Sequence, residues 1–326
     1  MSFAHYIKEI GNGEQSGSIS EEDAYQLFGA MLDGGVPDLE MGAILAAMSA
    51  RTQTLDALLG FYRASSERLN QLHSPTTNLK PIVIPTYTGA RHQANLVPLV
   101  ALVLQRFGVP VLLHGTLESL GGASTAHILR ELGVMPQPSL TAAQKVLDEE
   151  GLVFVPTAAI SPGLANLMAL RHRLGFRNSA HTIIKFIAPF VEESIPMVCM
   201  RNLACLEMAR DFFSATNANA LLMGGTDGEA FANPERRPQI EYFETGRSRV
   251  LFEAEGSSTK FLLAQPANIG AHETAAWIRD CLAGRAPIPY PIVNQLACCL
   301  YVSGYTDDMN QAKAIAAVET GSLAVA

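Results

Sequence analysis

The sequence contains few cysteines, and their spacing fits no metal module. There are five, no pair has Cys-x-x-Cys spacing, and none stands at ligand-like spacing to a histidine. We therefore expect neither a disulfide framework nor a zinc site, but free thiols in a cytoplasmic protein.

Charged residues are also sparse, at 17% against 48% hydrophobic residues in a chain of 326, which excludes general disorder.

Long hydrophobic runs are missing as well. The nearest candidate, residues 96–113, is interrupted by Gln, Arg, Gly and Pro, and fits a buried helix, a turn and a buried strand better than a membrane span. The first 17 residues contain no apolar core of a signal peptide. We expect a cytoplasmic location and no membrane partner.

Acidic residues are absent from two stretches of an otherwise acidic chain. The formal net charge is −8, yet residues 68–117 and 151–191 contain no Asp or Glu and sum to +8. If the two stretches lie together, they form a positive cleft that attracts phosphates and polyanions. The second stretch includes the densely basic sequence RHRLGFRNSAHTIIK and is the stronger candidate. The alternative is a plain solvated face.

The pattern of apolar residues divides the chain into two parts. Residues 1–75 predict a small helical N-terminal domain. In residues 76–326, short apolar strands alternate with helices, which is typical of a mostly parallel sheet flanked by helices. Residues 238–254 predict a β-hairpin within this larger domain. The predicted fold class is therefore α/β, and ligands of such sheets bind at the carboxyl ends of the strands.

The usual nucleotide and hydrolase motifs are absent. The chain has no Walker loop, no G-x-G-x-x-G fingerprint and no G-x-S-x-G elbow. Thr88-Gly89 follows one predicted strand, His114-Gly115 ends another, and Asp227-Gly228-Glu229 follows a third. The first of these turns has backbone amides suited to phosphate, and the third offers two carboxylates. Each is also compatible with an ordinary turn.

The order of these motifs resembles that of the anthranilate phosphoribosyltransferase family (glycosyltransferase family 3) over nearly the whole chain. Residues 84–95, 173–182 and 221–229 are similar to motifs of its YbiB subgroup. The resemblance implies a nucleoside-phosphorylase-like fold and a homodimer. Enzymes of the family join phosphoribosyl pyrophosphate to anthranilate with Mg²⁺, whereas the YbiB subgroup is regarded as nucleic-acid-binding without that activity.

The resemblance implies a vestigial phosphoribosyl pyrophosphate pocket. Its matching residues are Thr88, Gly89, Asn95, His114, Gly115 and Asp227. Arg177 matches the arginine that the family associates with anthranilate.

Several residues that the enzyme chemistry requires are replaced. Ala90-Arg91 stand where the family has Gly-Asp, Val97-Pro98 replace a phosphate-binding Ser-Thr, and Leu113 replaces a lysine. Ala230-Phe231 replace the magnesium-binding Asp-Glu pair. Because Mg²⁺ requires oxygen ligands and a pyrophosphate leaving group depends on cations, we expect no catalytic residues, no metal and no cofactor.

The sequence therefore predicts a nucleic-acid-binding protein that contacts backbone phosphates of single- or double-stranded DNA, with RNA as a further candidate, and has little sequence specificity. The predicted binding residues are all basic: Arg91, Arg171, Arg173, Arg177 and Lys185. Helices over residues 164–174 and 179–190 are expected to carry most of them. If Arg173 and Arg177 shared a helix, they would share a face. Tyr87 and Phe176 are candidates for base stacking, with a place in the hydrophobic core as the more common alternative for either residue.

Two other functions stay open. The first is an active phosphoribosyltransferase that uses anthranilate or another aromatic acceptor. It would need Mg²⁺, held at a site rebuilt from Asp227 and Glu229. The second is a small-anion or nucleotide sensor that uses the same cleft without chemistry.

Overall fold

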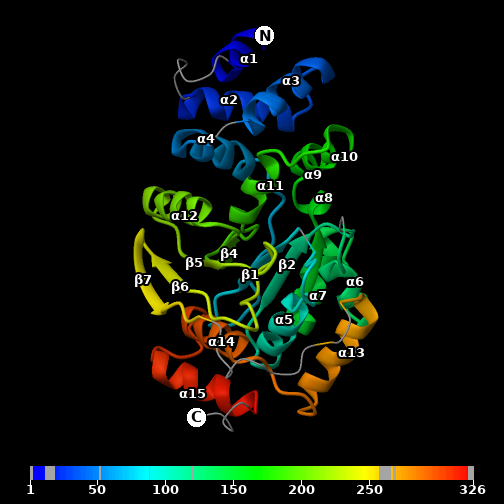
Figure 1. Cartoon of the computed structure of the whole chain (residues 1–326), viewed down its shortest axis with the longest axis vertical. Helices are drawn as coiled ribbons and strands as arrows, with labels where there is room; N and C mark the ends of the chain where they lie inside the picture. Colours follow the sequence, from blue (N-terminus) through cyan, green and yellow to red (C-terminus); the bar gives the residue numbers. More distant parts are fainter. Residues whose placement is uncertain are drawn as a thin grey trace. The chain divides into compact units, whose positions relative to one another are not determined.

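The computed structural model describes residues 3–11, 19–50, 53–87, 89–118, 121–256, 266 and 269–321 (Figure 1). Two compact units are formed. Unit 1 is Met1–Gln71 with Thr157–Pro189, and unit 2 is Leu72–Pro156 with Phe190–Ala326. This division differs from a single boundary at residue 75, because the segment after residue 156 packs with the N-terminal helices. There the Asn70 amide donates to the Ile160 carbonyl at 2.8 Å.

Unit 1 is helical. Its elements are α1 (Ala4–Gly11), α2 (Glu21–Leu32), α3 (Asp38–Ser49), α4 (Leu55–Ser66), α8 (Thr157–Ile160), α9 (Pro162–Ala169), α10 (Arg171–Leu174), α11 (Ala180–Ile183) and the 3-10 turn η2 (Ile184–Phe186). Ser20 and Thr54 cap α2 and α4 by accepting amide hydrogen bonds. These two helices pack closely, with the rings of Phe28 and Phe61 stacked 4.5 Å apart.

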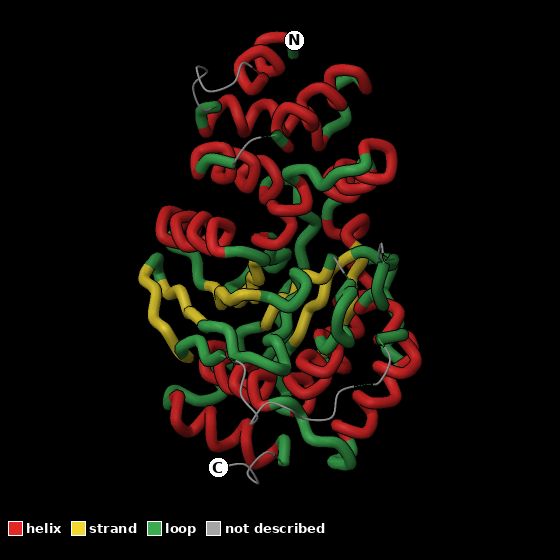
Figure 2. Tube along the Cα trace, in the orientation of Figure 1, coloured by secondary structure: helices red, strands yellow, loops and turns green. Residues whose placement is uncertain are grey.

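Unit 2 is built on a seven-stranded sheet (Figure 2). Its strands are β1 (Ile82–Thr86), β2 (Val111–Gly115), β3 (Leu152–Pro156), β4 (Ile195–Met200), β5 (Ala220–Gly224), β6 (Ile240–Glu244) and β7 (Arg247–Phe252). The order is β3-β2-β1-β4-β5-β6-β7, parallel from β3 to β5 and antiparallel at β6 and β7. The predicted α/β class, with a mostly parallel sheet and a terminal hairpin, is confirmed.

Helices cover both faces of this sheet (Figure 1). They are α5 (Val97–Arg106), α6 (Thr125–Glu131), α7 (Leu140–Glu150), α12 (Leu203–Thr216), α13 (Ala271–Leu282), α14 (Tyr290–Val302) and α15 (Met309–Glu319). Two adjacent residues of β6 distinguish the faces. The Tyr242 ring lies 6.5 Å from that of Tyr301 in α14, whereas the Phe243 ring lies 5.2 Å from that of Phe213 in α12.

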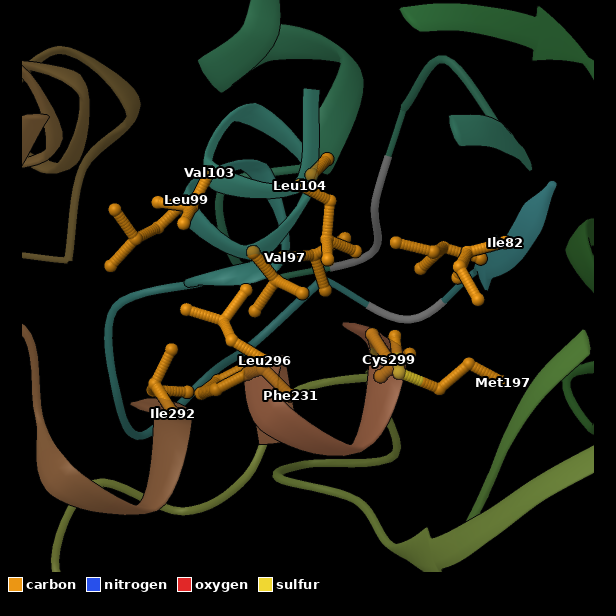
Figure 3. Close-up of a cluster of buried hydrophobic side chains, with 14 of the residues drawn as sticks. Ile82, Val97, Leu99, Val103, Leu104, Met197, Phe231, Ile292, Leu296 and Cys299 are labelled. Atoms are coloured by element: carbon orange, nitrogen blue, oxygen red, sulfur yellow. The ribbon is translucent and has the colours of Figure 1, made fainter. Parts of the chain in front are cut away.

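The main hydrophobic core lies between the sheet and helices α5 and α14 (Figure 3). Ile82 and Ile84, alternate residues of β1, are completely buried in it. Cys298 and Cys299 of α14 belong to the same core, and burial raises the pKa of the Cys299 thiol to about 12. All five cysteines are free thiols, as expected. Within the described ranges, no helix is both long and apolar enough to cross a membrane.

Gly115 allows β1 and β2 to approach each other. A Cβ atom at this position would lie 1.9 Å from the Thr86 carbonyl oxygen. We predict that Gly115→Ala lowers the free energy of unfolding by about 3 kcal/mol, because the paired strands must separate. Urea denaturation measures this change.

Gly42→Ala is the control, because Gly42 lies in α3 with open space at its Cβ position. It should stabilise by about 0.5–1 kcal/mol. Equal effects of the two variants would contradict the packing argument.

Candidate functional site

The loop between β1 and α5 is tied to a fully buried carboxylate. Glu229, which follows β5, accepts a hydrogen bond from the Thr86 hydroxyl at 2.6 Å. The same carboxylate accepts from the backbone amides of Tyr87 at 3.2 Å and Gly89 at 2.8 Å. Three donors from one loop therefore compensate the cost of burying this acidic side chain.

A second carboxylate holds the next turn of the same loop. Asp227 accepts from the amides of Arg91 and His92 at 2.8 and 2.9 Å, and pairs with the His92 ring at 2.9 Å. Burial alone would raise the pKa of the Asp227 carboxyl. The hydrogen bonds from His92 and Arg91 outweigh this effect and hold the pKa below its usual value. Asp227 is therefore an anion that the loop stabilises.

These contacts change the interpretation of the predicted phosphate loop. The amides of Gly89, Arg91 and His92, which would have to face a bound phosphate, already donate to carboxylates of the protein. A phosphate would have to displace two carboxylates from the amides that they already occupy. Thr88, the other predicted residue of this turn, lies outside the described residues.

The other residues that match the family's pocket have clear structural roles. Asn95 is buried; its amide nitrogen donates to Thr125 Oγ1 at 2.9 Å, and its carbonyl oxygen accepts from the Val97 amide at 3.2 Å. His114 is completely buried, and its Nδ1 is hydrogen-bonded to the Tyr87 hydroxyl. Because Tyr87 is itself buried in this contact, its predicted role in base stacking is wrong.

Magnesium does not fit this region. Ala230 and Phe231 are buried and offer no oxygen side chain, while Asp227 and Glu229 are engaged by loop donors. Among the residues that the structure describes, no group of three or more His, Cys, Asp or Glu side chains could hold a metal ion. Rebuilding a metal site from Asp227 and Glu229 would require the loop to release both carboxylates.

Unit 1 contains a cluster of positive charge around a buried histidine. Arg171, Arg177 and Lys185 lie close enough to His181 to affect its titration. The pKa of His181 is lowered to about 4. Burial of the imidazole contributes most to this shift, followed by the charges of Arg177 and Arg171. The imidazole is therefore neutral at pH 7. Arg171, Arg177 and Lys185, which we call the basic cluster, are all half-buried.

The local backbone of this region differs from the prediction. The predicted helix 164–174 is divided into α9 and α10, and α10 ends at Gly175, whose φ of 79° is left-handed. Arg177 therefore lies beyond the end of α10 and does not share a helix face with Arg173. The predicted helix 179–190 is replaced by the short α11 and η2. Asn178 holds the turn between α10 and α11, with its side-chain nitrogen donating to the Leu167 carbonyl at 2.6 Å.

The two remaining predicted cations have different surroundings. Arg173 is exposed in unit 1 and forms an ion pair with Asp38 at 3.2 Å. Arg91 is exposed and belongs to unit 2. Phe176, which directly precedes Arg177 in the sequence, is half-buried. The structure thus brings three of the five predicted residues together, at His181.

Comparison with known proteins agrees with this architecture. Residues 4–68 match the helical bundle domain of the glycosyl transferase family. YbiB of Escherichia coli (strain K12), an uncharacterized protein, is 40% identical over 306 residues, which cover 93% of this chain and 95% of YbiB. An anthranilate phosphoribosyltransferase of Geobacillus thermodenitrificans (strain NG80-2) is 27% identical over 186 residues, 56% of this chain and 52% of the enzyme.

A solved structure gives the same picture in three dimensions. The anthranilate phosphoribosyltransferase of Thermus thermophilus has a TM-score of 0.74 and 22% identity, covering 97% of this chain and 94% of the enzyme. The fold is therefore that of the anthranilate phosphoribosyltransferase-like proteins. Within that class, the extent of its identity to YbiB shows that the chain belongs to the YbiB family. The resemblance predicted from the motifs is confirmed.

The role of Glu229 can be tested by removing its charge. We predict that Glu229→Gln lowers the free energy of unfolding by about 2–3 kcal/mol, because one acceptor oxygen becomes a donor group that faces loop donors. Chemical denaturation measures the loss. Glu235→Gln is the matched control on an exposed side chain, where a change within about 0.5 kcal/mol is expected. A Glu229→Gln variant as stable as the control would exclude the proposed role of this carboxylate.

The titration of His181 predicts a particular pH dependence. Because the folded pKa is about 4 and the ordinary value is 6.5, the unfolded state binds the proton first as pH falls. This residue's contribution to stability should therefore decrease from pH 6.5 to 4, by on the order of 3 kcal/mol, and stay constant below that range. Unfolding curves of the wild type and His181→Gln at several pH values isolate it from other titrations. Parallel pH profiles for the two proteins would contradict this assignment.

Proposed function

We propose that this protein binds nucleic acids through their backbone phosphates and does not transfer phosphoribosyl groups. The observation that carries the proposal is the basic cluster, in which the charges of Arg171, Arg177 and Lys185 all help to lower the pKa of His181. The cluster combines three positive charges in one short segment that contains no acidic residue. Such a local concentration of charge favours a ligand with several closely spaced phosphates.

The chemistry of the side chains supports a phosphate ligand. Arginine presents a planar set of donors that matches phosphate oxygens. Solvent and salt screen the attraction between a phosphate and a half-buried arginine less than that of a fully exposed one. Arg173, on the same segment, is exposed and its pairing with Asp38 is of the weak surface type. It is therefore available to exchange Asp38 for a phosphate. A homodimer, which the family resemblance implies, would present this set of cations twice.

The β1–α5 loop argues against transferase activity. Transfer from a pyrophosphate leaving group requires donors and a metal ion around the developing negative charge. In this chain, carboxylates occupy the loop amides, and Ala230 and Phe231 replace the metal ligands of the family. Phosphoribosyl transfer to anthranilate or another aromatic acceptor is the second candidate function, favoured by the shared fold alone.

The proposal is tested by fluorescence anisotropy of labelled single- and double-stranded DNA and RNA, titrated with the full chain over a salt series. We expect binding with little dependence on sequence and a steep negative slope of log affinity against log salt. In the variant Arg171→Gln, Arg177→Gln, Lys185→Gln, the slope should become shallower by about 2–3, because each lost phosphate contact contributes about 0.7–0.9.

The matched control neutralises three exposed cations elsewhere: Lys8→Gln, Arg130→Gln, Lys145→Gln. Both variants have the same net charge, so a general electrostatic effect changes them equally, and a specific surface changes only the first. Circular dichroism and gel filtration verify that each variant folds. Equal slopes for the two variants would refute this surface. Absence of any binding at low salt, together with Mg²⁺-dependent consumption of phosphoribosyl pyrophosphate, would instead establish the transferase.

A further inference from the structure

A second concave region of unit 2 is separate from the basic cluster. A pocket of about 690 Å³ opens at the carboxyl ends of β4 and β5 and lies within unit 2. Its walls come from the start of α12, from the segment that joins β5 to β6, and from residues just after β7. The volume is within the range of small-molecule sites, and the ends of parallel strands are where such sites form.

Four arginines line this pocket, and carboxylates hold two of them. Arg210 forms a two-pronged pair with Glu241, with contacts at 2.7 and 3.0 Å. Arg237 pairs with Glu255 at 3.1 Å and donates to the Glu253 carbonyl at 2.9 Å. These contacts fix the two guanidinium groups in the wall, and they also neutralise Glu241 and Glu255.

The other two arginines face the pocket without such a partner. Arg201 follows β4 and Arg236 lies in the β5–β6 segment, and both are exposed. Neither forms an ion pair with any residue that the structure describes. The third carboxylate of the lining, Asp227, is engaged by the donors of Arg91 and His92. With every lining carboxylate engaged, Arg201 and Arg236 are two positive charges without an ion-pair partner at this pocket, and they favour an anionic ligand.

One side of the pocket is apolar. Leu203, at the first position of α12, is 64% exposed, although large aliphatic side chains are usually buried. Leu206 and Pro238 lie in the same lining. An anionic group beside the arginines would therefore place the rest of a ligand against a hydrophobic surface.

We propose that this pocket binds a phosphate monoester with a flat organic group, of the size of a nucleoside monophosphate. Arg201 and Arg236 would hold the terminal phosphate, and Leu203, Leu206 and Pro238 would cover the organic group. A terminal phosphate fits better than a nucleic-acid backbone, because two cations in a concave site match one dianion, whereas a polyanion is bound by a longer series of contacts. This site is independent of the basic cluster in unit 1.

Isothermal titration calorimetry of the full chain with 5′-AMP tests the proposal, with adenosine and inorganic phosphate as the two partial ligands. We expect saturable binding of 5′-AMP, weaker binding of phosphate and no measurable binding of adenosine. Arg201→Gln and Arg236→Gln should each weaken 5′-AMP binding about tenfold or more, since each removes a charge-assisted contact. Both side chains are exposed, so the variants are expected to fold. Arg130→Gln, an exposed arginine on α6, is the control and should have no effect.

Three results would overturn this inference. The first is a lack of saturable 5′-AMP binding at millimolar concentration. The second is binding that both arginine variants leave unchanged. The third is a loss of nucleic-acid affinity in these variants with unchanged 5′-AMP binding, which would make the pocket part of a nucleic-acid surface. None of these results depends on the basic cluster, because its variant Arg171→Gln, Arg177→Gln, Lys185→Gln should bind 5′-AMP normally.

Discussion

The hydrogen bonds of the buried Glu229 carboxylate set the structure at the carboxyl ends of β1 and β5. This carboxylate connects the loop after β5 to the loop after β1, across 140 residues of sequence, through Thr86, Tyr87 and Gly89. Thr86 continues the network to Thr125 at 2.5 Å. Burying a carboxylate is costly, and it is tolerated only when donors such as these surround it. The result is a loop whose conformation is set by the protein itself, without a ligand.

The same network gives a structural role to residues that match those of the family's enzymes. Asn95 is retained because Thr125 and Val97 use both ends of its amide group. Gly115 is retained because no side chain fits beside the Thr86 carbonyl. Each residue would be selected for folding alone, so its presence is weak evidence for phosphoribosyl transfer. The replacements Ala230 and Phe231 are more informative, because they turn two positions of metal ligands into buried apolar side chains.

The sequence predicts the sheet well and the site only in part. Strands β1 to β5 are short apolar runs, a pattern that depends only on neighbours in sequence. The predicted hairpin over residues 238–254 contains β6 and β7. The end of the predicted helix 164–174 is found correctly, because glycine in a left-handed conformation commonly ends a helix. The predicted helix 179–190 is wrong, because only the short α11 and η2 form there. The role of Glu229 could not be predicted, because its partners are defined only by how the two loops meet in space.

The pocket arginines show a different reason why a charge pattern in sequence is incomplete. The acid-free stretches pointed to residues 151–191, where positive charge is visible in a linear count. Arg201 and Arg236 lie outside these stretches, among acidic residues such as Glu235, and therefore do not stand out. In the folded unit, Glu241 and Glu255 are taken up by Arg210 and Arg237, so their negative charge does not cancel that of the remaining arginines. What determines anion binding is which charges are already paired, and pairing is a property of the fold. By the same argument, the loop after β1 has amides suited to phosphate, but these amides already donate to Asp227 and Glu229.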